Sequence, residues 1–113
     1  RVINQISLRV EGLEDLRQIL PALEAESDVT EIDPINHGIA WSIYFRDPEN
    51  NRIEIFCDAP WYVEQPMVEK LDLSTDDEAI HARTEEAIRD RPGFQPMTDW
   101  RAAFAEKLEA AMA

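Results

Sequence analysis

The chain has 113 residues, of which 44% are hydrophobic, so it is long enough for one small domain with its own core. Its formal net charge of −13 disfavours nucleic acid and anionic membranes as partners, and no run of about 18 apolar residues offers a membrane span. The one cysteine, Cys57, excludes an internal disulfide and favours a cytoplasmic location. The chain starts at Arg1 without a methionine, which suggests a piece of a longer or processed protein.

The chain begins with a strand pattern followed by a helix pattern. Residues 2–10 predict a strand with two unlike faces, because side chains two positions apart share a face. We expect its even-numbered, mostly apolar face to pack on a helix. The odd-numbered face is mostly polar, includes Gln5, and is expected to line a concave surface. Residues 13–25 predict a helix that Pro21 kinks or divides near residues 17–21.

Three further strands are predicted in the next part of the chain. Residues 29–33 form a short β-rich stretch that we expect Pro34 to end. Residues 41–46 are aromatic and β-rich, and residues 52–57 alternate polar and apolar side chains. The turn cluster between the last two strands contains Asn50 and Asn51, either of which can adopt a positive φ.

The second half of the chain predicts an extended arm and two helices. The arm covers residues 60–73, and the first helix runs from an N-cap at Thr75 to about Arg89. The last helix covers about residues 98–112 and carries an apolar stripe. We therefore divide the chain into a module of residues 1–59 and a helical extension of residues 60–113.

The module resembles a known superfamily in its order of elements and in its motifs. The order is strand, helix, strand, strand, strand, and the motif residues are His37-Gly38, Ile43-Tyr44-Phe45, Asp47-Pro48, Asn51-Arg52 and Glu54. This pattern resembles the vicinal oxygen chelate superfamily, which includes extradiol ring-cleavage dioxygenases, glyoxalase I and bleomycin resistance proteins. The likeness is closest to the C-terminal module of the extradiol dioxygenases. It implies an α+β fold: a single βαβββ module, half of a cupped mixed sheet, followed by the helical extension.

The resemblance also implies a set of site residues. Glu54 falls on the metal-binding glutamate of the last strand, and Gln5 stands where the dioxygenases carry a metal-binding histidine. His37 and Tyr44 fall on active-site residues that contact the substrate or the bound oxygen, so they are the implied catalytic residues. The implied cofactor is a divalent metal, which is Fe(II) for a dioxygenase, with Mn(II), Zn(II) or Ni(II) as other possibilities.

Each of these side chains also has a purely structural interpretation. Glu54 lies between isoleucines in the middle of a strand, where a charge needs a partner, and Arg9 or Arg46 is an alternative to a metal. Gln5 is equally compatible with a bond to a neighbouring strand. His37 is equally compatible with an ordinary loop histidine, and Tyr44 with a hydroxyl at the rim of a sheet.

Five other residues receive structural predictions. Trp41, Trp61 and Tyr62 are expected in the core or in an interface rather than around a ligand. His81 is expected to be solvated. Cys57 is expected to be a buried thiol on the helix side of the sheet, because no basic residue or second cysteine is near it in sequence.

The leading hypothesis is therefore a metal-dependent, extradiol dioxygenase-like protein that acts on a small aromatic or other vicinal-oxygen substrate. One module makes half of the cup, so we expect a homodimer or a missing N-terminal module to complete it. A glyoxalase-like or lyase-like metalloenzyme is the first alternative. A metal-free ligand-binding or resistance protein of the same fold is the second.

Overall fold

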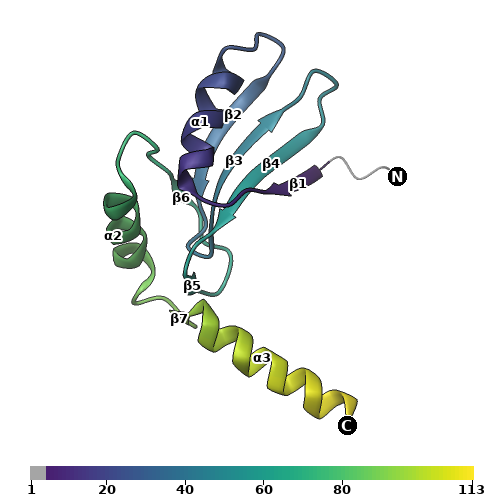
Figure 1. The fold of residues 1–113 in the computed structure, drawn as a ribbon, viewed down its shortest axis with the longest axis vertical. Coiled ribbons are helices and arrows are strands. Elements are labelled where there is room, and N and C mark those ends of the chain that lie inside the picture. Colours follow the sequence, from purple (N-terminus) through teal and green to yellow (C-terminus); the bar gives the residue numbers. More distant parts are fainter. Residues whose placement is uncertain (1–4) are drawn as a thin grey trace.

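The computed structural model describes residues 5–113 and has an α+β fold, which confirms the predicted class (Figure 1). The first elements are β1 (Gln5–Arg9), α1 (Leu13–Glu24), β2 (Thr30–Asn36), β3 (Ala40–Arg46) and β4 (Arg52–Asp58). The later elements are β5 (Trp61–Tyr62), β6 (Glu69–Lys70), α2 (Asp77–Ile88), β7 (Gln95–Pro96) and α3 (Met97–Met112). Among the described residues, no helix is long and apolar enough to cross a membrane.

The main sheet has five strands in the order β1-β4-β3-β2-β6. β1 runs parallel to β4, and the other neighbours are antiparallel. The order of the first five elements is the predicted βαβββ order, and it is broadly consistent with the expected half cup. The predicted arm supplies β6, which extends the sheet beyond β2, and β5 pairs with β7 in a separate ribbon.

α1 packs on one face of the sheet through its leucines. Leu13 and Leu16 are buried in the same core cluster as Ile43 and Ile53. The Asp15 carboxylate accepts hydrogen bonds from the N–H groups of Glu11 and Gly12, which satisfies donors at the start of the helix. Pro21 lies inside the helix, which continues to Glu24 without a break.

β2 is longer than predicted, and Pro34 lies within it instead of ending it. The register shifts between Thr30 and Asp33, and Glu31 has a φ of 53° at this irregularity. Bulges and positions near a sheet edge tolerate proline, because its missing N–H then breaks no ladder bond. Beyond β2, the neighbouring β6 is only two residues long.

The N-cap of α2 is Asp76, one residue later than the predicted Thr75. The Asp76 carboxylate accepts a 2.8 Å hydrogen bond from the Ala79 N–H. The Thr75 hydroxyl donates instead to the Asp72 carbonyl at 2.8 Å, which holds Thr75 in the turn before the helix. α3 begins at Met97, close to the predicted start.

The core joins the predicted extension to the module. Leu71, Leu73 and Ile80 are buried in one cluster with Trp41 and Ile43 of β3. α2 therefore shares a core with the sheet, although it lies below α1 in Figure 1, toward the β5 end of the molecule. The division at residue 59 stays a prediction.

Thr84 of α2 is the polar link between that helix and the sheet. Its hydroxyl accepts hydrogen bonds from Asn36 Nδ2 at 2.8 Å and Trp41 Nε1 at 3.0 Å, and it donates to the Ile80 carbonyl at 2.7 Å. Asn36 Oδ1 in turn accepts from the Gly38 N–H at 2.8 Å. This buried network fixes the end of β2, and His37 follows directly.

Gly38 makes the connection from β2 to β3 possible. Its φ is +77°, which favours glycine. A Cβ at this position would lie 2.8 Å from Val63 Cγ1 and 3.0 Å from Ile88 Cγ2. The Gly38 backbone therefore lies directly against the core residues Val63 and Ile88. This contact fixes the position of the backbone next to His37.

Candidate functional site

Glu54 lies in the middle of β4, on the face of the sheet turned away from α1. Its neighbours in the strand, Ile53 and Ile55, belong to the α1 side, where they contribute to the core. The pairing of the strands places Glu54 opposite Tyr44 on β3 and Ser7 on β1. These three side chains therefore lie on the same face of the sheet, as strand alternation predicts.

Three hydroxyl groups bind the Glu54 carboxylate. Ser7 donates to Oε1 at 3.0 Å, while Ser42 donates to Oε2 at 2.8 Å and Tyr44 donates to Oε2 at 3.0 Å. A carboxylate has about four lone-pair positions, so one position on Oε1 is left. The carboxylate is thus stabilised by neutral donors and is partly accessible.

The alternative arginine partners of Glu54 are engaged elsewhere. Arg9 forms an ion pair with Asp58 at 3.7 Å, and Arg46 forms one with Glu31 at 3.3 Å. The interpretation of Glu54 as the ion-pair partner of either arginine is therefore wrong. Sequence alternation placed both arginines near this face but could not show which acid each would meet.

His37 extends the row of hydrogen bonds away from Glu54. Its Nε2 lies 2.8 Å from the Tyr44 hydroxyl, and its Nδ1 lies 2.9 Å from the Met67 carbonyl oxygen. A carbonyl oxygen only accepts, so Nδ1 carries a hydrogen. The Tyr44 hydroxyl has one hydrogen, so when it donates to Glu54 its oxygen accepts from His37 Nε2.

The surroundings of Tyr44 favour its protonated form. Burial raises the pKa of Tyr44 to about 12, and the nearby Glu54 charge acts in the same direction. The Arg52 guanidinium lies 4.5 Å from the centre of the Tyr44 ring and opposes the shift. Tyr44 is therefore suited to donate a hydrogen bond or a proton at neutral pH, and not to act as a base.

A pocket of about 410 Å³ opens along this row. Its polar lining comes from β1, β3, β4 and the segment after β5, and its apolar lining comes from the start of β3 and from β4. The lining residues are Ser7, His37, Ile39, Ala40, Tyr44, Glu54, Phe56 and Gln65. Such a volume accommodates a small organic molecule with the row of polar groups at one wall.

Sequence reasoning missed three polar residues of this site. Ser7 and Ser42 bind Glu54, and Gln65 donates from Nε2 to the His37 carbonyl at 3.0 Å. Strand alternation places Ser7 and Ser42 on the face of the sheet that carries Glu54. Only the register between strands, which alternation does not give, shows that they meet Glu54.

Gln5 shares the face of Glu54 but is in register with Arg52. The β1 side chain in register with Glu54 is that of Ser7. Gln5 is exposed near the end of the described chain. Its assignment as a ligand stays a prediction.

The described residues fit one part of a divalent-metal site and not a complete one. Glu54 offers one anionic oxygen with a free lone-pair position. Nowhere in residues 5–113 do three or more His, Cys, Asp or Glu side chains gather in a way that could hold a metal ion. Hard divalent ions need several oxygen or nitrogen donors, so Glu54 would need further ligands, such as an amide oxygen of this chain or groups of a second module.

The remaining predicted residues have structural positions. Trp41 is buried in the core, and Trp61 and Tyr62 are half-buried in the β5 segment. His81 is exposed, as expected, although its ring lies 5.0 Å from that of Trp41. Cys57 is fully buried in the core on the α1 side, which confirms that prediction, and burial raises the pKa of its thiol to about 11.

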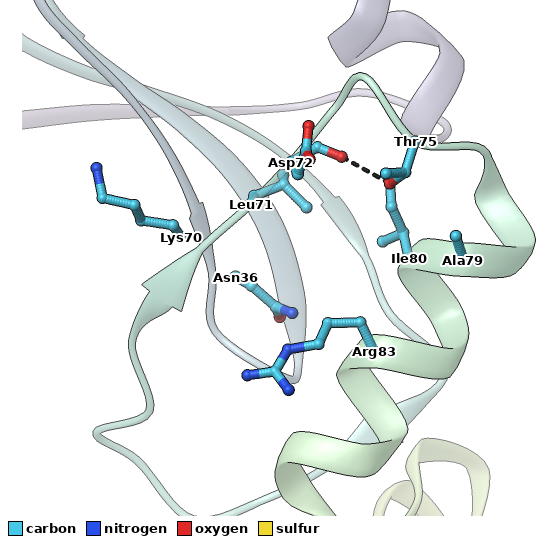
Figure 2. A pocket seen from close by; sticks show the side chains of 8 residues that line it. All are labelled: Asn36, Lys70, Leu71, Asp72, Thr75, Ala79, Ile80 and Arg83. Carbon is cyan, nitrogen blue, oxygen red and sulfur yellow. Dashed lines mark hydrogen bonds between the residues drawn. The ribbon is translucent and has the colours of Figure 1, made fainter.

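A second pocket of about 410 Å³ lies between β6 and α2 (Figure 2). Its lining residues are Asn36, Lys70, Leu71, Asp72, Thr75, Ala79, Ile80 and Arg83. The Arg83 guanidinium is already bound by the Glu69 carboxylate, with contacts at 2.6 and 3.1 Å. The charge of that arginine is thus balanced within the chain, and the pocket offers weaker recognition than the Glu54 row.

Comparisons of the chain with protein-family models, with curated proteins and with solved structures found no match.

Proposed function

We propose that this chain is one module of a metal-dependent, extradiol dioxygenase-like protein of the vicinal oxygen chelate superfamily. The observation that supports this most is the continuous row of hydrogen bonds from Glu54 through Tyr44 to His37. All three residues belong to the motif on which the resemblance rests. They also line one pocket, although they come from three separate parts of the chain.

In this proposal the substrate is a small aromatic molecule with two adjacent oxygens, which the pocket volume suits. With substrate bound, the Tyr44 hydroxyl would turn from Glu54 and donate its one hydrogen to a substrate oxygen, since its raised pKa keeps the hydroxyl protonated. His37 would donate from Nε2 to the Tyr44 oxygen, and the Met67 carbonyl would keep the ring oriented through Nδ1.

Glu54 would contribute the carboxylate ligand to a divalent metal, and Gln5 would add a neutral ligand or orient one. When bound, such a metal supplies a Lewis acid that holds both substrate oxygens and accepts dioxygen. The rest of its ligands would come from a second copy of the chain or from another module. The same residues would serve a glyoxalase-like or lyase-like enzyme, which needs no dioxygen.

A second candidate is a metal-free binding protein, and one observation favours it. The Glu54 carboxylate is already bound by three hydroxyls, which partly replace the charge compensation that a metal would provide. In that case the polar side chains that line the pocket would recognise a ligand by hydrogen bonds alone.

Catechol turnover under air, with Fe(II) supplied, tests the first proposal against the second. The proposal expects oxygen uptake and a ring-opened product from the assembled protein. It expects loss of both in Glu54→Gln, and a reduction of about 10²-fold or more in Tyr44→Phe. Glu49→Gln, which removes a carboxylate from the exposed turn, is the matched control and should keep full activity. Catechol binding without oxygen uptake, weakened by Glu54→Gln, would instead support the binding protein.

A further inference from the structure

α3 carries an apolar stripe whose part beyond Trp100 is exposed in the described chain. The stripe consists of Trp100, Phe104, Leu108 and Met112. The last three are 46%, 48% and 84% exposed, and α3 has no buried residue. A helix of this length is marginal in water unless an apolar face is packed.

Only the first turn of α3 is anchored to the body. The Met97 N–H donates to the Pro60 carbonyl at 2.8 Å, and the Trp100 ring stacks on Tyr62 at 4.7 Å. The helix starts next to β5 and β7 and runs outward from there (Figure 1). Residues 101–113 are all exposed. The outer part of the stripe is therefore directed away from the chain's own sheet.

The charges of α3 differ from those of the rest of the chain. Two basic and three acidic residues give α3 a net charge of −1, which leaves −12 of the total −13 on the other residues. Arg101 and Lys107 lie three positions on either side of Phe104 and so flank the stripe, whereas Glu106 and Glu109 lie on the far side. The stripe with its basic flanks is complementary to an acidic surface that bears apolar groups.

β1 offers such a surface on the α1 side of the sheet. Ile6 and Leu8 are in register with Ile53 and Ile55, yet they are 49% and 52% exposed. The sequence-based expectation that this face packs on a helix is thus not met within the chain, because α1 covers β3 and β4 instead. Glu11 follows β1 and is exposed. Glu14 and Asp15 lie in the first turn of α1, where Glu14 pairs with Arg17 at 3.4 Å and Asp15 accepts from the N–H groups of Glu11 and Gly12.

We propose that α3 is an exchanged arm that packs on β1 of a second copy of this chain. Its apolar stripe would cover Ile6 and Leu8 of the partner, and its basic flanks would face the acidic segment that follows β1. The exchange is reciprocal and closed, so it gives a two-fold dimer. At 1.5 Å per residue α3 is about 24 Å long, enough to span a five-residue strand of about 17 Å. This inference does not depend on the metal or on catalysis.

Cross-linking of two single variants tests the proposed contact. Leu8→Cys and Leu108→Cys are mixed under mild oxidation, and buried Cys57 does not compete. We expect a disulfide between the two different chains, at twice the 13.0 kDa chain mass. Leu8→Cys mixed with Glu106→Cys, whose new thiol lies on the far face of α3, is the control and should link at least about tenfold more slowly. Equal rates for both mixtures, or preferential Leu108→Cys self-linking, would overturn the proposal.

Light scattering on charge-matched double variants gives a second, independent test. Phe104→Glu with Leu108→Glu should weaken dimerisation at least about tenfold, since two charges then enter the apolar contact. Ala102→Glu with Ala110→Glu adds the same charge on the opposite face and should leave dimerisation almost unchanged. A wild-type mass of 13.0 kDa at all concentrations, or equal weakening by both pairs, would contradict the exchanged arm.

Discussion

Tyr44 has one hydroxyl proton and two hydrogen-bonding neighbours, Glu54 and His37. The distances of 3.0 and 2.8 Å are both short enough for real hydrogen bonds, so the direction of one bond determines the direction of the other. When the Tyr44 hydroxyl donates its hydrogen to Glu54, its oxygen is left to accept from His37 Nε2. The directions of the two hydrogen bonds are therefore linked.

The raised pKa of Tyr44 predicts a stability change at alkaline pH. The folded protein keeps Tyr44 protonated up to a pKa of about 12, whereas the unfolded chain releases the proton near 10.0. The stabilisation is present below pH 10.0 and is lost as the pH rises to about 12. Tyrosinate absorbance, compared between wild type and Tyr44→Phe, isolates this residue. Glu54→Gln should lower the Tyr44 pKa, and an unchanged titration in that variant would exclude a role for the Glu54 charge.

At the scale of elements, α2 is held to the sheet by a buried polar network as well as by apolar packing. Every buried side-chain nitrogen and oxygen in residues 5–113 has a hydrogen-bond partner. Thr84 serves two donors at once, Asn36 and Trp41, which belong to β2 and β3. His37 follows Asn36 in the chain, so this network also supports the candidate site.

Thr84→Val should therefore destabilise the protein clearly. It leaves two buried donors without an acceptor, and each such group costs about 1–3 kcal/mol. Thr84→Ser keeps the hydroxyl and loses only a methyl group, at about 1 kcal/mol. Urea unfolding followed by tryptophan fluorescence gives both free energies. Equal losses in the two variants would show that packing, and not the hydroxyl, is what matters at this position.

Strand alternation was enough to predict which face each site residue occupies. Glu54 and Tyr44 lie on one face, and Cys57 lies on the other among the core residues, because the period of two holds along β3 and β4. The positive φ of Asn50 was also predictable from the turn composition. These features depend on residues close together in sequence.

Contacts between distant segments could not be predicted in the same way. Ser7 and Glu54 are 47 positions apart, and their hydrogen bond depends on the parallel register of β1 with β4. Pro34 looked like the end of a strand, but a bulge and a short neighbouring strand accommodate it. Likewise, the arm of residues 60–73 showed no alternation long enough to predict β6.

At the scale of the whole molecule, three features of the described chain are incomplete. The sheet has an uncovered apolar strip at β1, and α3 has an uncovered apolar stripe. The Glu54 row offers one strong metal ligand where a full site needs several. All three observations are explained if the working protein contains more than one such module.

The amount of metal bound per chain tests the central claim most directly. The assembled protein is incubated with Fe(II), Mn(II), Zn(II) or Ni(II), and the retained metal is measured in wild type, Glu54→Gln and Gln5→His. Our account predicts retained metal in the wild type, its loss in Glu54→Gln because the anionic ligand is gone, and tighter retention in Gln5→His because imidazole is the stronger ligand. A wild type that retains none of these metals, or a Glu54→Gln variant that retains as much as the wild type, would contradict the account.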